Sequence, residues 1–146
     1  RSPNPLLARH AWHLGPSLDL DAMNEAALSF LGDHDFSSFC RKPKSGPGYD
    51  QPSMKRTLQA ARWTRDSWLD TDPSPLLRFE VTATSFCHQM VRSMVGTLVD
   101  VGFGRLAVDS MSAVLAERHR NAAGQVAPPH GLMFHAVGFD GRRWDA

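Results

Sequence analysis

The chain has 146 residues, of which 42% are hydrophobic, and its formal net charge is +1. This size and apolar content allow one buried core without disulfide or metal support, so we expect residues 1–146 to form a single domain. No apolar run approaches the roughly 20 residues that cross a bilayer, and the start of the chain lacks the apolar segment of a secretory signal.

Cysteine usage predicts the compartment. The two cysteines, Cys40 and Cys87, form no CxxC pair or other spaced framework, and the chain has six methionines. This pattern is typical of proteins kept in a reducing compartment, so we expect a cytoplasmic protein. The chain also lacks an initiator methionine, which favours the tail of a longer chain.

Charge is distributed unevenly along the chain. Residues 19–35 contain five acids and no base, whereas residues 41–65 contain a single acid, Asp50. The Lys and Arg of this second segment are Arg41, Lys42, Lys44, Lys55, Arg56, Arg62 and Arg65. Such a basic stripe can follow a phosphate backbone. The alternative is a solvated loop and edge strand whose Lys and Arg discourage aggregation.

A first helix is predicted over residues 19–32, after a short extended piece at residues 10–14. Asp19 is placed to cap this helix and Gly32 to end it. Its apolar residues share one face, namely Leu20, Met23, Ala27, Phe30 and Leu31. The Pro- and Gly-rich residues 41–55 follow and predict a mobile loop.

Two strands are predicted next, at residues 56–65 and 76–85. In the second strand Leu77, Phe79 and Val81 alternate with polar residues. The turn sequence "DTDPSP" lies between the two strands and predicts a hairpin.

Helices are predicted at residues 86–102 and, with Asp109 as its cap, at residues 110–118, and a last strand at residues 131–139. This order of elements predicts an α+β fold, in which a largely antiparallel sheet is covered on one face by helices.

The helix predicted at residues 86–102 has one unusual face. His88, Arg92 and Gly96 follow each other at i, i+4 spacing on the narrow side of an otherwise apolar helix. Gly96 costs helix propensity, which a close approach of another backbone or of a ligand could offset. The alternative is a solvent-facing Arg whose stem covers apolar surface.

Four sequence blocks resemble the C-terminal half of the tRNA pseudouridine synthase A family. They are "LGDHDFSSF", "KRTL", "FCHQMVRSMVGTLVDVGFG" and "APPHGL", in the family's order and within residues 10–139. The resemblance implies a pseudouridine synthase-like fold and an enzyme that isomerises uridine to pseudouridine in the anticodon stem-loop of tRNA. It also implies a homodimer that uses neither a metal nor an organic cofactor.

The resemblance also implies roles for single residues. In the family's catalytic site, the Arg of the "MVR" block pairs with the essential Asp and orients it, which assigns that role to Arg92. Leu132 would form an apolar wall for the uracil, with Gly131 in the turn before it. Gly96 and His88 are expected near the substrate. RNA contacts are expected from the basic stripe, at Arg41, Lys42, Lys44, Lys55 and Arg56.

The catalytic Asp of the family lies in an Arg-Thr-Asp motif, and the chain contains no such motif. Asp35 is expected to be a turn acceptor and not its replacement. We therefore expect this chain to be a C-terminal fragment that is inactive alone, since the N-terminal half is absent. Two alternatives remain, a non-catalytic RNA-binding module and a dimerisation domain. Metal binding is not expected, because the histidines and cysteines show no zinc-ligand spacing.

Overall fold

The computed structural model of the chain describes residues 4–15, 17–42, 52–66, 76–139 and 142–145. The chain divides into two compact units. The larger unit is residues 16–127, and the smaller unit combines residues 1–15 with residues 128–146. The expectation of a single domain stays a prediction.

The larger unit contains a three-stranded antiparallel sheet in the order β1-β2-β3. Its strands are β1 (Gly32–Asp35), β2 (Lys55–Asp66) and β3 (Leu76–Ala83). The predicted hairpin of the second and third strands is confirmed, with Trp63 opposite Phe79. Alternation of apolar and polar residues explains this success, since it is the pattern of a half-buried strand. The first strand, β1, was not predicted.

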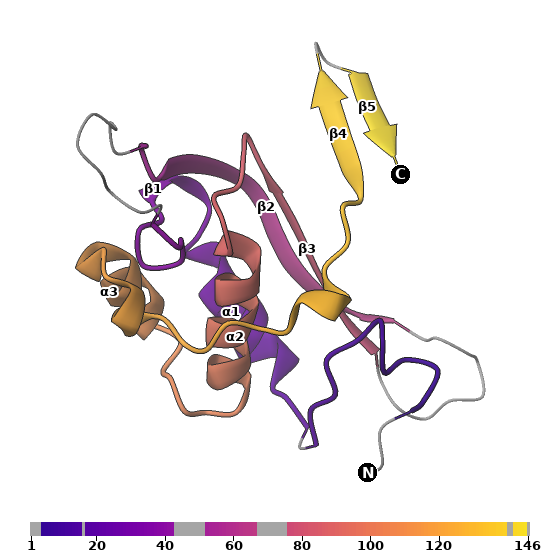
Figure 1. The fold of residues 1–146 in the computed structure, drawn as a ribbon. Helices are drawn as coiled ribbons and strands as arrows, with labels where there is room; N and C mark the ends of the chain where they lie inside the picture. Colours follow the sequence, from indigo (N-terminus) through magenta and orange to yellow (C-terminus); the bar gives the residue numbers. More distant parts are fainter. Residues whose placement is uncertain (1–3, 16, 43–51, 67–75, 140–141, 146) are drawn as a thin grey trace. The chain divides into compact units, whose positions relative to one another are not determined.

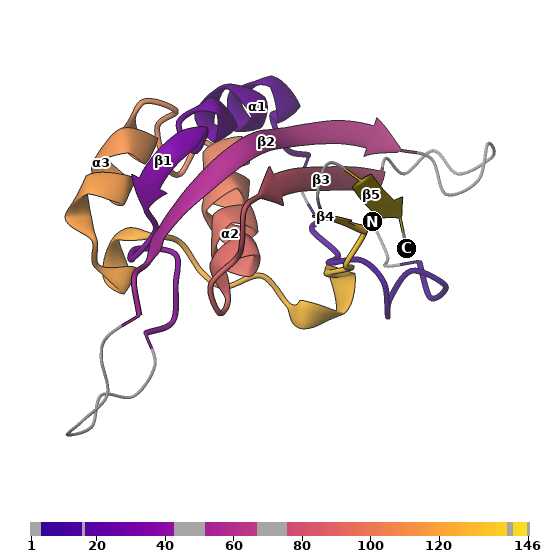
Figure 2. The ribbon, with the colours of Figure 1, turned by 90° about the horizontal axis from the view of Figure 1, so that it is seen from above.

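Helices α1 (Leu20–Leu28) and α2 (Met90–Gly102) lie side by side on one face of this sheet (Figures 1 and 2). The predicted α+β class, an antiparallel sheet with helices on one face, is confirmed. Side chains from both helices and from residues 36–39 form the core, with Phe30 and Phe39 in edge contact at 5.1 Å between ring centroids. Asn24 fixes α1 to β2, because its amide exchanges two hydrogen bonds with the backbone of Trp63.

The predicted boundaries of α1 are partly right. The Asp19 side chain accepts a hydrogen bond of 3.0 Å from the backbone N–H of Ala22, which confirms the predicted cap. The helix ends at Leu28, before Gly32, so the chain leaves the helical path and Leu31 is 38% exposed. The prediction that Leu31 belongs to the apolar face is therefore wrong.

Helix α2 begins at Met90, four residues later than predicted, because Gln89 has a left-handed backbone with φ +66°. Phe86, the first residue of the predicted helix, lies before α2 and is 44% exposed, so it does not join the core. The helix is buried on more sides than its apolar pattern predicts, since Ser93, Gly96 and Thr97 are buried as well. Of the predicted narrow polar face, His88 lies before the helix and is exposed, Arg92 is half-buried and Gly96 is buried.

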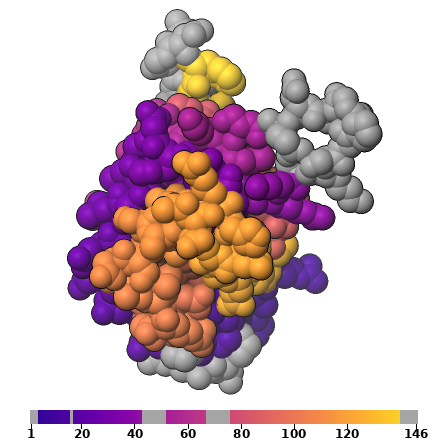
Figure 3. All heavy atoms as spheres, turned by 90° about the vertical axis from the view of Figure 1, so that its left-hand side faces the viewer, coloured from indigo at the N-terminus to yellow at the C-terminus, as the bar shows by residue number. Residues whose placement is uncertain are grey.

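Helix α3 (Ser110–Glu117) completes the larger unit and is followed by the short 3-10 helix η1 (Arg120–Ala122). Asp109 stands at the predicted cap position of α3 but makes no side-chain capping bond. Met111, Val114 and Leu115 are buried as the sequence pattern predicts. Figure 3 shows α3 and the segment after it at the surface of the larger unit.

The smaller unit contains the 3-10 helix η2 (Pro129–Gly131) and a hairpin of β4 (Ala136–Phe139) and β5 (Arg142–Asp145). The strand predicted at residues 131–139 is thus shorter than expected. The extended piece predicted at residues 10–14 is not a strand. Across the described residues of both units, we find no helix with the length and apolar character needed to span a bilayer.

Candidate functional site

Arg92, the residue for which the resemblance implies a catalytic role, is half-buried on α2. Its Nε–H donates a hydrogen bond of 2.6 Å to the carbonyl oxygen of Ala127. The backbone N–H of Ala127 donates a bond of 3.0 Å to the carbonyl oxygen of Arg92. Together these bonds fix the Nε end of the guanidinium, while its two terminal nitrogens have no hydrogen-bond partner among the described residues. Among the described residues, no carboxylate forms an ion pair with Arg92.

The space next to Gly96 is filled by the chain itself. A Cβ atom added to Gly96 would lie 1.7 Å from the carbonyl oxygen of Gln125. Thr97, one residue further, accepts a hydrogen bond of 2.9 Å from the backbone N–H of Gly124 and donates one of 2.8 Å to the carbonyl oxygen of Ser93. Of the two possibilities that the sequence left open, another backbone therefore occupies the position. The ligand contact expected at Gly96 stays a prediction, and this backbone occupies the side on which a Cβ would lie.

The segment that covers Gly96 also carries the partner of Arg92. The guanidinium of Arg120 holds this segment from its other end, with hydrogen bonds of 3.1 Å to the carbonyl oxygen of Ala123 and 2.8 Å to that of Gly124. Residues 123–127 are thereby attached both to Arg120 and to α2. The position of the Arg92 side chain follows from this close packing, which Gly96 permits.

The basic residues expected to contact RNA lie partly together. The larger unit has a hollow of about 380 Å³, which we call the basic hollow. Its lining residues are Arg41, Lys42, Pro52, Met54, Arg56, Cys87 and His88. The hollow thus joins three expected RNA-binding residues with His88, which was expected near the substrate. Lys55 is exposed on β2 but does not line the hollow, and Lys44 lies outside the described residues.

The two cysteines are joined, although their spacing in the sequence shows no disulfide framework and led us to expect a reducing compartment. Cys40 and Cys87 form a disulfide with their Cα atoms 5.7 Å apart. The backbone N–H of Arg41 also donates a hydrogen bond of 2.9 Å to the carbonyl oxygen of His88. The two segments that flank the basic hollow are therefore held by a covalent bond and a hydrogen bond. Separation by 47 residues hid this pairing from the sequence pattern.

Asp35 is a turn acceptor, as expected, and not a free carboxylate. Its Oδ1 accepts hydrogen bonds from the hydroxyl of Ser37, at 2.6 Å, and from the backbone N–H of Ser37, at 3.0 Å. The Ser37 hydroxyl is the main cause that lowers the pKa of Asp35 below 3.8, and partial burial opposes it. Arg118 and Lys42 lower the pKa further. These interactions stabilise the ionised carboxylate in a structural role.

Leu132 and Gly131, the expected substrate wall and its turn, belong to the smaller unit. The side chain of Leu132 is 52% exposed, and its backbone N–H donates a hydrogen bond of 3.1 Å to the carbonyl oxygen of Pro129. The ring of His130 contacts the carbonyl oxygen of Ala11 at 3.1 Å. An exposed Leu held in a 3-10 turn is available for contact with an apolar surface.

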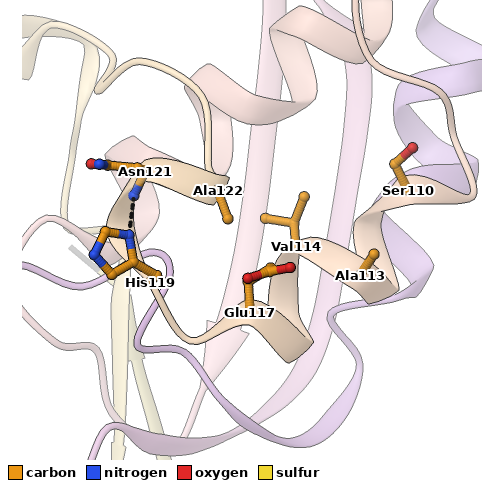
Figure 4. A pocket seen from close by; sticks show the side chains of 7 residues that line it. All are labelled: Ser110, Ala113, Val114, Glu117, His119, Asn121 and Ala122. Atoms are coloured by element: carbon orange, nitrogen blue, oxygen red, sulfur yellow. Dashed lines mark hydrogen bonds between the residues drawn. The ribbon is translucent and has the colours of Figure 1, made fainter.

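A second hollow, of about 450 Å³, lies between α3 and η1 and was not predicted (Figure 4). Glu117 and His119 are its ionisable residues. The ring Nδ1 of His119 accepts a hydrogen bond of 3.3 Å from the backbone N–H of Asn121. Most of the other lining side chains are small or apolar, so this hollow offers few groups for chemistry.

Comparison with known proteins gives consistent matches. The sequence model of a family described as tRNA pseudouridine synthase matches residues 26–140, more than half of the chain. A "tRNA pseudouridine synthase A" of Streptomyces griseus is 39% identical over 137 residues, which cover 93% of this chain and 44% of the relative. The protein of the same name from Brucella ovis is 39% identical over 140 residues, covering 96% and 50%. The chain therefore spans about half the length of these curated relatives.

Proposed function

The chain belongs to the tRNA pseudouridine synthase family, and we propose that it is the C-terminal half of an enzyme that isomerises uridine to pseudouridine in the tRNA anticodon stem-loop. The observation that carries this proposal is the position of Arg92. Its Nε–H is fixed to Ala127 while no described carboxylate pairs with the guanidinium. A guanidinium prepared in this way suits an aspartate from another part of the protein.

In this proposal Arg92 is a positioning residue for the catalytic Asp. The enzyme detaches the uracil base, turns it and rejoins it to the ribose through carbon. The Asp must be ionised and held in one orientation, which a guanidinium fork with its Nε already bound can achieve. The Asp would come from an N-terminal half, so the chain alone would be inactive.

Substrate contacts complete the proposal. Leu132 would form an apolar wall for the uracil, with Gly131 setting the turn before it, since the Leu132 side chain is exposed. Arg41, Lys42, Lys44, Lys55 and Arg56 would contact the tRNA. We also propose a homodimer that needs no metal or organic cofactor, as the resemblance to the family implies. A cytoplasmic location is part of the proposal as well, although the Cys40–Cys87 disulfide removes the cysteine argument for it.

Tritium release from tRNA labelled at uracil C5 tests the proposed reaction, because rejoining the base through C5 displaces that hydrogen. The measurement compares this chain with the product of its complete reading frame. We expect release by the longer protein and none by the 146-residue chain alone. Tritium release by the isolated 146-residue chain would contradict the proposal that its catalytic Asp lies in an N-terminal half. If neither protein released tritium, the proposed isomerase activity would be contradicted.

The second candidate function is a non-catalytic RNA-binding module, which the basic hollow favours. Such a module would need Arg41 and Lys42 but not Arg92. In that case Arg92→Ala would leave RNA affinity nearly unchanged. Neither the 146-residue chain nor the product of its complete reading frame would release tritium. A dimerisation domain would instead show a mass that depends on concentration and no affinity for RNA.

A further inference from the structure

The basic hollow concentrates positive charge among its described lining residues. Three of its lining residues carry a positive charge, namely Arg41, Lys42 and Arg56, and His88 adds an imidazole ring. None of the described residues that line it is Asp or Glu. The other lining residues add an apolar surface, namely Pro52, Met54 and Cys87. Positive groups beside low-polarity walls attract anions more strongly than isolated surface charges do.

Arg56 is already ordered in the hollow. Its Nη1 donates hydrogen bonds of 2.8 Å to the carbonyl oxygen of Ser53 and 2.7 Å to that of Lys55. Its Nε is buried and has no hydrogen-bond partner among the described residues. An Arg held by backbone carbonyls loses little rotamer freedom when it binds a ligand, so more of the interaction is kept as affinity.

The walls of the hollow are fixed as well. Cys87 lines the hollow and is bonded to Cys40, the residue directly before Arg41. The hydrogen bond from Arg41 N–H to the His88 carbonyl joins the same two segments. Groups from residues 41–42, from the beginning of β2 and from the turn before α2 are thus arranged before any ligand binds. This preorganisation is a property of a built site, beyond a charged surface alone.

We propose that the basic hollow binds one phosphodiester group of the tRNA backbone, with Arg56 as the ordered anchor and Lys42 and Arg41 at the rim. This inference rests on the proposed function for the identity of the RNA. No Trp, Tyr or Phe is among the described residues that line the hollow, which favours a phosphate over a stacked base. The site therefore sets the position of the RNA and carries no information about its sequence.

The test measures the dissociation constant of an anticodon stem-loop hairpin at several salt concentrations, using the complete reading frame. Arg56→Gln and Lys42→Gln each remove one charge from the hollow. Arg62→Gln is the matched control, since Arg62 is exposed on the same strand as Arg56 and does not line the hollow. Thermal unfolding of each variant checks that the fold is kept, and Lys42, exposed on the rim, serves if Arg56→Gln does not fold.

We expect each hollow variant to reduce the slope of log K against log salt, by no more than about one because the hollow holds a single phosphate, and to weaken binding about 5- to 10-fold at about 0.15 M salt. The control should change neither value by more than about twofold. Unchanged slopes in the folded hollow variants would overturn the proposal. An equal loss in Arg62→Gln would also overturn it, because binding would then depend on diffuse charge.

A second readout follows the Nε–H signal of Arg56 by NMR during titration with the hairpin and with inorganic phosphate. A shift with the hairpin supports the proposal, whereas a shift with inorganic phosphate alone identifies an anion site unrelated to tRNA and overturns it. Tritium release distinguishes the proposed isomerase activity from the proposed phosphate site. If the complete protein releases tritium but the hollow variants keep the salt slope, the activity stands and the phosphate site is wrong. If the slopes fall but no tritium is released, the phosphate site stands and the activity is wrong.

Discussion

Arg92 and Ala127 exchange two hydrogen bonds, one from the Arg92 Nε–H at 2.6 Å and one from the Ala127 backbone N–H at 3.0 Å. The pair joins the beginning of α2 to a segment that is 35 residues away in sequence. Because the Nε–H is used in this way, rotation of the guanidinium is restricted. The Nε–H of Arg92 therefore has a structural role, while its two terminal nitrogens would bind the catalytic Asp in the proposed reaction.

Arg92→Lys tests these two roles of the guanidinium, since Lys keeps the positive charge but has neither the Nε–H nor the paired terminal nitrogens. In the complete reading frame we expect kcat to fall about 10- to 100-fold, because the Asp loses its fixed orientation, while KM changes little. The unfolding free energy should fall by about 1–3 kcal/mol through loss of the bond to Ala127. Tritium-release kinetics and urea unfolding measure the two effects. An unchanged kcat would exclude the positioning role.

Gly96→Ala tests the contact between α2 and the segment that covers it. Alanine is better than glycine by about 1 kcal/mol in a helix, which alone would stabilise the protein. The added Cβ would lie 1.7 Å from the Gln125 carbonyl oxygen, however, so backbone must move, at a cost of about 1–3 kcal/mol or more. We therefore expect a net loss of stability in urea unfolding.

Gly15→Ala is the control for this change, because no atom lies within 4 Å of a Cβ added at Gly15. Its stability should remain within about 0.5 kcal/mol of the parent chain. A Gly96→Ala protein as stable as the parent would mean that residues 123–127 do not pack against α2 as described. In the complete reading frame, Gly96→Ala should also reduce kcat, since Ala127 would move with the displaced backbone.

The hairpin of β2 and β3, the core face of α3 and most of the core face of α1 could be predicted because the information for them is local. Alternating residues such as Leu77 and Phe79 specify a strand wherever one face is buried. The beginning of α2 could not be predicted in the same way. Phe86 continues the apolar spacing of the helix, but the left-handed backbone of Gln89 interrupts it. A periodic pattern of apolar residues cannot predict that one residue adopts a left-handed backbone conformation.

The candidate site depends mostly on contacts between residues distant in sequence. Gly96 signalled a close approach, yet nothing in its neighbourhood identified Gln125 as the partner. The basic hollow likewise combines residues 41–42, β2 and the turn before α2, and its disulfide spans 47 residues. Residue types therefore indicated Arg92 and the basic stripe, while the geometry that relates them required the folded chain.

Asp35 should make stability depend on pH in the acid range. Its folded pKa lies below the ordinary 3.8, chiefly because the Ser37 hydroxyl donates to it. A lowered carboxyl pKa contributes stability that is present above the unfolded pKa and is lost as the pH falls through the folded pKa. Urea unfolding between about pH 5 and pH 2 should show this loss, and Asp35→Asn should lack its share of it.

Ser37→Ala is the matching variant, because it removes the main donor and leaves the carboxylate in place. We expect the pKa of Asp35 to move upward in this variant, as measured by NMR titration of its carboxyl group. If the difference in stability between Asp35→Asn and the parent chain were the same at every pH, the carboxylate would not be stabilised by these contacts.

The Cys40–Cys87 disulfide should stabilise the folded chain against the unfolded one. A covalent link across 47 residues reduces the entropy of the unfolded ensemble, which is typically worth about 2–4 kcal/mol. Added dithiol reductant should therefore lower the unfolding free energy of the parent chain by about this amount. Cys87→Ala cannot form the bond, so its stability should be insensitive to reductant. Alkylation of the unfolded parent chain without reductant should modify neither cysteine, whereas modification of both would show separate thiols and restore the expectation drawn from the sequence.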